Sequence, residues 1–314
     1  MAANNTAYEE GFAEVNGIRL HYVAQGSGKL AILLHGFPEY WYSWRHQIPY
    51  LARSFRTVAP DLRGYNTSDK PAGVKSYKIE ELIKDVKGLI KYFGAEKAVI
   101  ISHDWGGVIA WDIAAYYPEV VEKLVVMNAP HPKAFLREIV KNPRQMLSSW
   151  YIFLFQIPGL AEWYMRRSDY RQIERVFTGW AHRKETFSKD DIRKFKDAIG
   201  RPGSLTATIN YYRALFRDAS GLKRVRNFPK IKVPTLLIWA ENDMALTKNL
   251  TYNLEPYFEA PLEIRYIPDC SHWVQQEQPG VVNKYLGEFL LQNGKTGDSG
   301  RKEERPLLRP RHGS

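Results

Sequence analysis

Short, continuously apolar runs recur along the chain, and segments with helical periodicity separate several of them. The runs are "LAILLHG", "TVAPDL", "AVIISHD", "KLVVMNAP", "PTLLIWAEND" and "LEIRYIPD", and each is typical of a strand buried on both faces of a parallel sheet. Between the second and third runs, apolar residues recur at helical spacing from Ile79 to Phe93, and Gly94 follows as a stop signal. Ahead of all of them, "GFAEVNGIRLHYVAQGSG" predicts two antiparallel strands joined by a tight turn at Asn16-Gly17. The pattern predicts an α/β protein.

The alternation of strands and helices breaks between about Pro132 and Pro229. This interval is helix-like and rich in aromatic residues, and it is too long for a plain loop. We therefore expect residues 132–229 to form a helical cap, seated at the strand ends where open α/β sheets bind ligands. Residues 10–131 and 230–292 are expected to form the core beneath it.

Composition narrows the class of protein. A chain of 314 residues with 44% hydrophobic content can bury a large core, and we expect one globular unit. The single cysteine, Cys270, rules out a disulfide framework and a cysteine-based structural zinc site. The opening residues lack a signal-peptide pattern and no run of about 18 apolar residues occurs, so we expect a soluble, cytoplasmic protein without an integral membrane segment.

The net charge of +11 does not by itself indicate a partner. The basic residues are scattered, and several lie in residues 293–314, a segment rich in charge, Gly and Pro that we expect to be disordered. A solvated basic surface is therefore expected, and no nucleic-acid partner. Nothing in the sequence fixes the oligomeric state, and a homodimer is compatible with it.

The stretch "SHDWGG" carries the clearest chemical signal. It matches the nucleophile elbow G-x-S-x-G with Asp104 at the serine position and Gly106 at the last glycine, and it lies between a predicted strand and a predicted helix. A carboxylate with an ordinary pKa of about 3.9 is already anionic at neutral pH, so it can attack a saturated carbon without a base. The resulting ester then needs a base to activate water. The alternative interpretation is that Asp104 only caps the helix.

Five motifs in order resemble a known family: "HGFPEYWYSW", "DLRGYNTSD", "SHDWGG", "WAENDMAL" and "CSHWVQQEQP". Over residues 10 to 292 the chain resembles the α/β-hydrolases of the epoxide hydrolase branch, which are related to haloalkane dehalogenases. The resemblance implies a mostly parallel eight-stranded sheet flanked by helices, an inserted helical cap, Asp104 as nucleophile, and no metal or organic cofactor.

The resemblance also assigns the groups that act on the ester. His272 follows the predicted last strand and is expected to be the base, oriented by the carboxylate of Asp243. Glu241 and Asp269 are the competing carboxylates. The amides of Phe37 and Trp105 are expected to form the oxyanion hole.

The leaving group separates the two branches of this family. An epoxide opens to an alkoxide, which needs a nearby acid, whereas a halide needs only N–H donors. The segments "WYIFLFQIPG" and "INYYRALF" resemble those that carry two acidic cap tyrosines in epoxide hydrolases, which suggests Tyr151 and Tyr212 for these roles. Tyr211 is the alternative to Tyr212.

We therefore expect an epoxide hydrolase that converts a small hydrophobic epoxide and water to a vicinal diol. The first alternative is a haloalkane or haloacid dehalogenase with the same aspartyl nucleophile, which Trp105 would suit as a halide donor. The presence of Phe37, where many of those enzymes have Asn, argues against it. The second alternative is a noncatalytic binding protein with the same fold.

Overall fold

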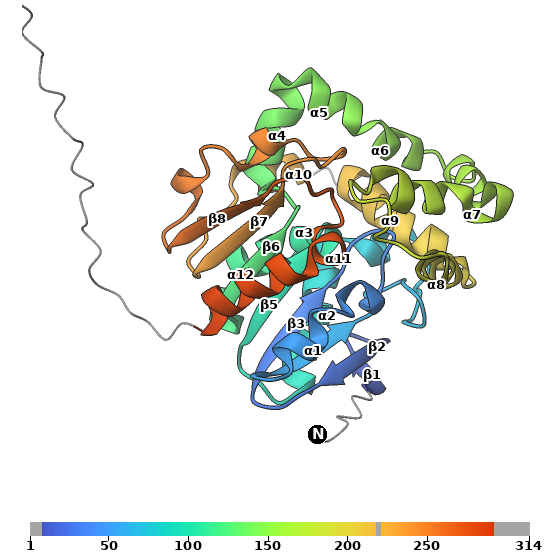
Figure 1. Ribbon diagram of the computed structural model, residues 1–314. Coiled ribbons are helices and arrows are strands. Elements are labelled where there is room, and N and C mark those ends of the chain that lie inside the picture. The colour runs from blue at the N-terminus through green and yellow to red at the C-terminus, as the bar shows by residue number, and fades with distance from the viewer. Residues whose placement is uncertain (1–7, 218–220, 292–314) are drawn as a thin grey trace, which may run out of the picture.

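The computed structural model describes residues 8–217 and 221–291, so the predicted disordered tail, residues 293–314, lies outside the described residues. Within these ranges the strands form one eight-stranded sheet, in the order β1-β2-β4-β3-β5-β6-β7-β8 (Figure 1). β1 pairs antiparallel with β2 and β2 with β4, and all other neighbours are parallel. The predicted α/β class with a mostly parallel sheet is confirmed. The strands are β1 Glu9–Val15, β2 Ile18–Gln25, β3 Lys29–Leu34, β4 Phe55–Pro60, β5 Ala98–His103, β6 Val121–Met127, β7 Thr235–Ala240 and β8 Leu262–Ile267.

Helices cover both faces of the sheet, which is why its central strands read as unbroken apolar runs. On one face, Ile100 of β5 belongs to the same apolar cluster as residues of α2 and α3. On the other, Ile101 belongs to a cluster with residues of α1 and α12. Every residue of β5 and of β7 is buried. The α-helices of the core are α1 Ile48–Leu51, α2 Ile79–Tyr92, α3 Trp105–Tyr116, α11 Val274–Glu277 and α12 Pro279–Leu291. Short 3-10 helices occur at η1 Trp41–Trp44, η2 Val74–Tyr77, η3 Pro118–Val120, η4 Lys248–Thr251 and η5 Glu255–Tyr257.

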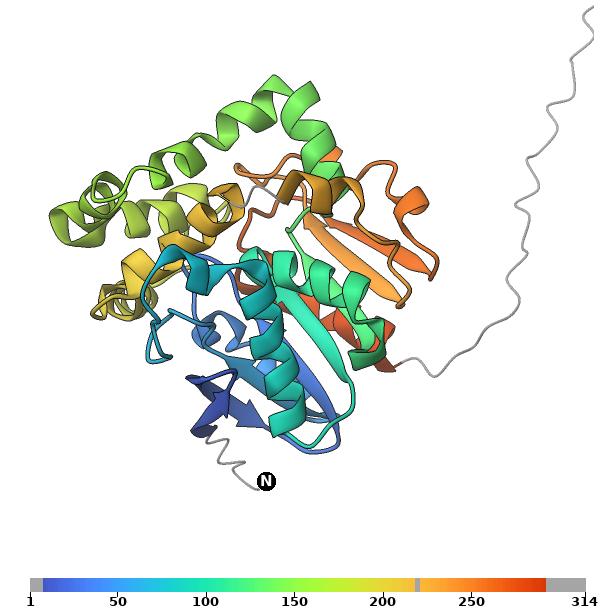
Figure 2. The same ribbon diagram turned by 180° about the vertical axis from the view of Figure 1, so that it is seen from behind.

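A second group of helices lies between β6 and β7 in the sequence, in the interval where the strand pattern breaks. Figures 1 and 2 show them stacked beyond one end of the sheet, on the side away from α12. The longest of them, α7, is interrupted by a kink, because its backbone angles are non-helical from Arg167 to Tyr170. The helices are α4 Pro132–Lys141, α5 Pro143–Ser148, α6 Trp150–Phe155, α7 Leu160–Trp180, α8 Lys189–Gly200, α9 Ser204–Arg217 and α10 Gly221–Arg226.

Two tight backbone features match the sequence analysis. The hairpin turn between β1 and β2 has positive φ at Asn16 (48°) and Gly17 (73°), as a tight turn of this kind requires. At the end of β5, Asp104 also has positive φ, 49°, with ψ of −118°, and α3 begins at the next residue. The strand therefore turns sharply into the helix and leaves the Asp104 side chain at the tip of the turn.

This turn leaves no room for larger residues beside it. A Cβ added to Gly106 would lie 2.1 Å from the carbonyl oxygen of Leu34, and one added to Gly36 would lie 2.3 Å from Asp104 Cβ. Both distances are far below van der Waals contact, so the backbones approach each other this closely only because these residues are glycines. The small residues of the elbow motif are thus explained by the packing of α3 against β3.

Replacing Gly106 tests this packing argument. We expect Gly106→Ala to lower the free energy of unfolding by about 3 kcal/mol, because its methyl group meets backbone that cannot rotate away. Denaturation in urea, followed by circular dichroism, measures the change. Gly280→Ala is the matched control, since nothing lies within 4 Å of its added Cβ, and it should change stability by less than about 1 kcal/mol. Equal stability of the two variants would contradict the argument.

Candidate active site

The Asp104 carboxylate stands at the tip of the turn between β5 and α3. Its Oδ1 accepts a hydrogen bond of 2.8 Å from the amide of Phe37, which follows β3. The side chain keeps 18% of its surface exposed, so a small molecule can reach it. Burial disfavours the anion, but His272, His103 and the Phe37 amide outweigh burial and hold the pKa of Asp104 below its ordinary value. Asp104 is therefore an anion that is partly accessible and ready to react.

The imidazole of His272 lies between two carboxylates. Its Nδ1 is 2.7 Å from Asp243 Oδ2, and its Nε2 is 3.5 Å from Asp104 Oδ2. Burial disfavours the imidazolium, but the charges and hydrogen bonds of the two carboxylates outweigh burial and raise the pKa of His272 to about 10. In the resting protein this ring is therefore a cation that links both carboxylates.

The carboxylate of Asp243 is completely buried and is held by several donors. Its Oδ1 accepts from the amides of Ala245 (2.8 Å) and Leu246 (3.0 Å), and its Oδ2 accepts from Asn128 Nδ2 at 2.7 Å as well as facing His272. These bonds fix the carboxylate toward the imidazole.

The competing carboxylates lie elsewhere. Glu241 pairs with Lys248 at the surface, and the Asp269 side chain is 76% exposed. Asn128, which the sequence analysis did not single out, sits directly after β6 with a φ of 41°, and its Oδ1 also accepts from the amide of Ala240. A polar residue that directly follows a buried strand is the one signal that could have drawn attention to it.

A second buried histidine and carboxylate lie behind the site, and the sequence analysis gave them no role. His103 Nδ1 is 2.8 Å from Glu39 Oε2, and its Nε2 is 2.8 Å from the backbone oxygen of His272. Burial opposes ionisation of Glu39, but His103 and the amide of Gly36 hold the pKa of that carboxyl below its ordinary value. The pair therefore connects the loop after β3 to the loop that carries His272.

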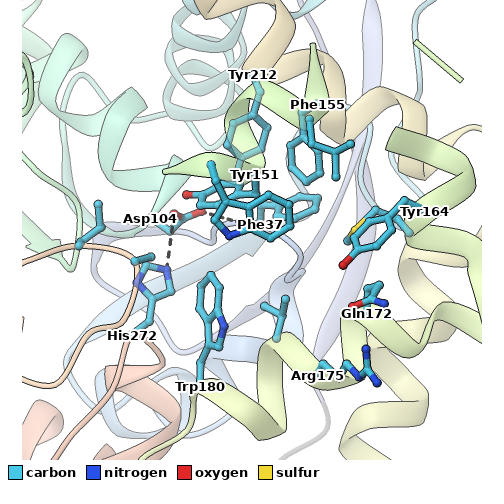
Figure 3. Close-up of a pocket in the computed structure, with 16 residues that line it drawn as sticks. Phe37, Asp104, Tyr151, Phe155, Tyr164, Gln172, Arg175, Trp180, Tyr212 and His272 are labelled. Carbon is cyan, nitrogen blue, oxygen red and sulfur yellow. Dashed lines mark hydrogen bonds and ion pairs between the residues drawn. The ribbon is translucent and has the colours of Figure 1, made fainter. Parts of the chain in front are cut away.

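A cavity opens above Asp104, and the cap helices supply most of its lining. Its volume is about 190 Å³, whereas a single water molecule needs only about 15 Å³. Figure 3 shows Tyr151 and Tyr212 beside Asp104, with His272 on the other side of the carboxylate and Tyr164, Gln172 and Arg175 at the far end. The remaining lining residues are Phe37, Trp150, Leu154, Phe155, Met165, Val176, Trp180, Ala245 and Leu246. The cavity is thus a mainly apolar chamber, with Asp104 and His272 at one end and the polar or basic side chains of Tyr164, Gln172 and Arg175 at the other.

The two predicted cap tyrosines lie together. Their rings meet edge to face with centroids 5.9 Å apart, Tyr151 from α6 and Tyr212 from α9. Burial and the nearby Asp104 raise the pKa of both phenols above the ordinary value of about 10. Both hydroxyls therefore stay protonated at neutral pH and can donate.

The neighbouring Tyr211 faces a different part of the protein. Its hydroxyl donates a hydrogen bond of 2.7 Å to the backbone oxygen of Arg63, and it does not line the cavity. The indole of Trp105 packs edge to face against Tyr212, with ring centroids 4.9 Å apart. As the first residue of α3, Trp105 has an amide without a partner inside the helix, as expected at a helix N-terminus. The Phe37-Pro38 peptide bond, beside the other predicted amide donor, is cis.

Known proteins resemble this chain over most of its length. The family model described as alpha/beta hydrolase fold matches residues 30–279. Epoxide hydrolase 3 of Xenopus tropicalis is 40% identical over 284 residues, which cover 88% of this chain and 76% of that protein. Epoxide hydrolase 4 of Homo sapiens is 39% identical over 289 residues, covering 90% of this chain and 78% of that protein.

Solved structures give the same result. The crystal structure of an epoxide hydrolase from Bacillus megaterium in complex with an inhibitor superposes with a TM-score of 0.83 at 32% identity, covering 90% of this chain and 100% of that one. The resemblance stated from the motifs is thereby confirmed. The chain belongs to the epoxide hydrolase family of the α/β-hydrolases.

Proposed function

We propose that this chain hydrolyses epoxides to vicinal diols through a covalent ester on Asp104. In this proposal Asp104 is the nucleophile, His272 the base, Asp243 its orienting carboxylate, and residues 132–229 the cap that carries the acids Tyr151 and Tyr212. The observation that supports it most is that the two phenols and the Asp104 carboxylate line one cavity, with His272 also in its wall. The cavity therefore contains both a carboxylate that can attack an epoxide carbon and phenols that can donate a proton to the epoxide oxygen.

The first step breaks the epoxide ring. Asp104 Oδ2 attacks one ring carbon while Oδ1 remains on the Phe37 amide, and the bond between that carbon and the ring oxygen breaks. The ring oxygen takes a hydrogen bond and then a proton from Tyr151 or Tyr212, which avoids a free alkoxide. The product of this step is a hydroxyalkyl ester of Asp104.

The second step depends on a change in charge. Esterification removes the negative charge of Asp104, which is one of the two carboxylates that raise the pKa of His272. The imidazolium then loses its proton more easily, and this proton restores the tyrosinate left by ring opening to a phenol. The neutral ring can then take a proton from water as that water attacks the ester carbonyl. The amides of Phe37 and Trp105 would hold the oxyanion formed on Oδ1. As it collapses, the departing diol oxygen takes the proton that His272 carries. The new carboxylic acid of Asp104 then returns its proton to His272, which restores the carboxylate and the imidazolium.

The two alternative functions have less support. A halide site needs N–H donors, and the Trp105 indole suits one, but the two phenols beside Asp104 supply the acid that only an alkoxide leaving group needs. A noncatalytic binding protein would have no use for an imidazole held between two carboxylates in the cavity wall. Epoxide opening accounts for both features.

The charge change can be mimicked by mutation. Because Asp104→Asn removes one of the two carboxylates, we expect the pKa of His272 to fall below about 10. An NMR titration of the His272 ring against pH measures this value. Asp269→Asn is the control, since that exposed carboxylate does not face His272 and its removal should leave the pKa unchanged. An unchanged pKa in Asp104→Asn would remove the proposed trigger for the second step.

The cap phenols should be needed for ring opening. We expect the double variant Tyr151→Phe and Tyr212→Phe to lower kcat/KM for styrene oxide by about 10²–10⁴-fold, because the alkoxide loses its proton donors. Tyr211→Phe is the matched control, as its hydroxyl bonds to backbone away from the cavity, and it should keep nearly full activity. Full activity in the double variant would exclude the phenols from the reaction.

The covalent ester itself can be detected. After a single turnover in heavy-oxygen water, the diol should carry an unlabelled oxygen from Asp104, and the label should enter the protein carboxylate. His272→Gln should still be alkylated by epoxide, so that mass spectrometry finds the adduct on Asp104 accumulating. Prompt label in the diol, or a His272→Gln variant without an adduct, would contradict the proposed cycle.

A further inference from the structure

The outer side of the cap exposes large apolar side chains in a regular order. Phe153 is 59% exposed and Trp163 57% exposed, which is unusual for side chains that globular proteins mostly bury. Leu147 of α5, Trp150 and Phe153 of α6, Ile157 of the connection after α6, and Leu160 and Trp163 of α7 are all exposed. Within α6 and within α7 the two exposed residues are three positions apart, so they lie on one face of the helix. Figure 1 shows α5 and α6 along the edge of the molecule farthest from α12. We call this surface the cap ridge, with the apolar residues Leu147, Trp150, Phe153, Ile157, Leu160 and Trp163.

The charged side chains within the cap ridge are basic. Lys141, Arg144, Arg166 and Arg167 are all exposed. The one acidic residue between positions 140 and 167 is Glu162, which is buried and paired with Arg213. These four basic residues, expected from the sequence to be scattered over a solvated surface, lie on the same helices as the exposed apolar side chains or just before them, and the guanidinium of Arg167 lies over the ring of Trp163, 5.0 Å from its centroid.

The cap ridge also adjoins the entrance of the active-site cavity. Trp150 is 56% exposed and at the same time lines the cavity. Arg175, which is likewise exposed, lines the cavity at the end far from Asp104. An apolar compound released at the cap ridge would therefore lie next to the cavity.

We propose that the cap ridge docks on an anionic lipid surface. Exposed Trp, Phe and Leu beside Lys and Arg are the side chains with which amphipathic helices lie in the headgroup region, where anionic lipids attract the basic residues. None of the helices in residues 8–217 and 221–291 combines the length and apolar content of a membrane span.

A second copy of the chain fits this surface less well. Two-fold pairing would place the same patch against itself. The basic residues of both copies would then face one another, and Asp169, the one exposed carboxylate within two residues of them, already pairs with Lys196. Anionic headgroups supply the missing charge. If the proposed function holds, the lipid surface is also the phase from which an apolar epoxide enters.

Flotation of the full chain with lipid vesicles tests the docking without reference to catalysis. The vesicles are phosphatidylcholine alone, or phosphatidylcholine with about a third phosphatidylserine. We expect the protein to float with the anionic vesicles, to float much less with the neutral ones, and to be released by high salt. Leu147→Ser with Phe153→Ser, and separately Arg144→Glu with Arg166→Glu, should each weaken binding by at least roughly tenfold.

Matched surface variants away from the cap ridge serve as controls. Phe12→Ser, at an exposed position of β1, and Lys91→Glu with Lys97→Glu, at exposed positions at and beyond the end of α2, should float like the unaltered protein. All variants should keep their rate on dissolved styrene oxide, which separates loss of docking from loss of the proposed activity.

Three results would overturn the docking proposal. The first is failure of the unaltered protein to float with anionic vesicles. The second is equal flotation of the cap-ridge variants and the controls. The third is a dimer in sedimentation velocity that the cap-ridge variants dissociate, without flotation of any form, which would make the surface an interface between copies.

Discussion

The structure of the site depends on one buried cation held between two anions. The imidazolium of His272 lies between Asp104 and Asp243, and each carboxylate also accepts from backbone amides. A carboxylate removed from water without such partners would take up a proton, and a protonated Asp104 could not attack carbon. The amide of Phe37 and the ring of His272 therefore keep Asp104 in the anionic form that its proposed role as nucleophile requires.

The residues of the site can meet because the strands that precede them run parallel to one another. Phe37 follows β3, Asp104 follows β5, Asn128 follows β6, Asp243 follows β7 and His272 follows β8. The carboxyl ends of parallel strands share one edge of the sheet, so residues far apart in the sequence become neighbours there. The positive φ of Asp104 then lifts its side chain clear of the helix that follows. This geometry also requires α3 to approach β3 so closely that only small residues fit between them.

Short-range sequence patterns predicted the elements: the apolar runs indicated the strands, and the elbow motif singled out Asp104. Asp243 and His272 were assigned by the family resemblance, and the fold brings all three side chains together. The pair of Glu39 and His103 was missed because neither residue has a local pattern, and their contact exists only after distant loops have packed. The choice between Tyr211 and Tyr212 could not be made from the sequence for a different reason. Each step along a helix turns the side chain by about 100°, so only the packing of the helix decides which of two adjacent tyrosines faces the cavity.

The cap couples the chemistry to the outer surface through very short helices. Helix α6 has six residues, with Tyr151 facing the cavity while Trp150 and Phe153 are exposed. In a helix of this length the inward and outward side chains share the same one or two turns, and Trp150 is both exposed and part of the cavity wall. The same six residues therefore form part of the chamber wall beside Asp104 and part of the outer surface.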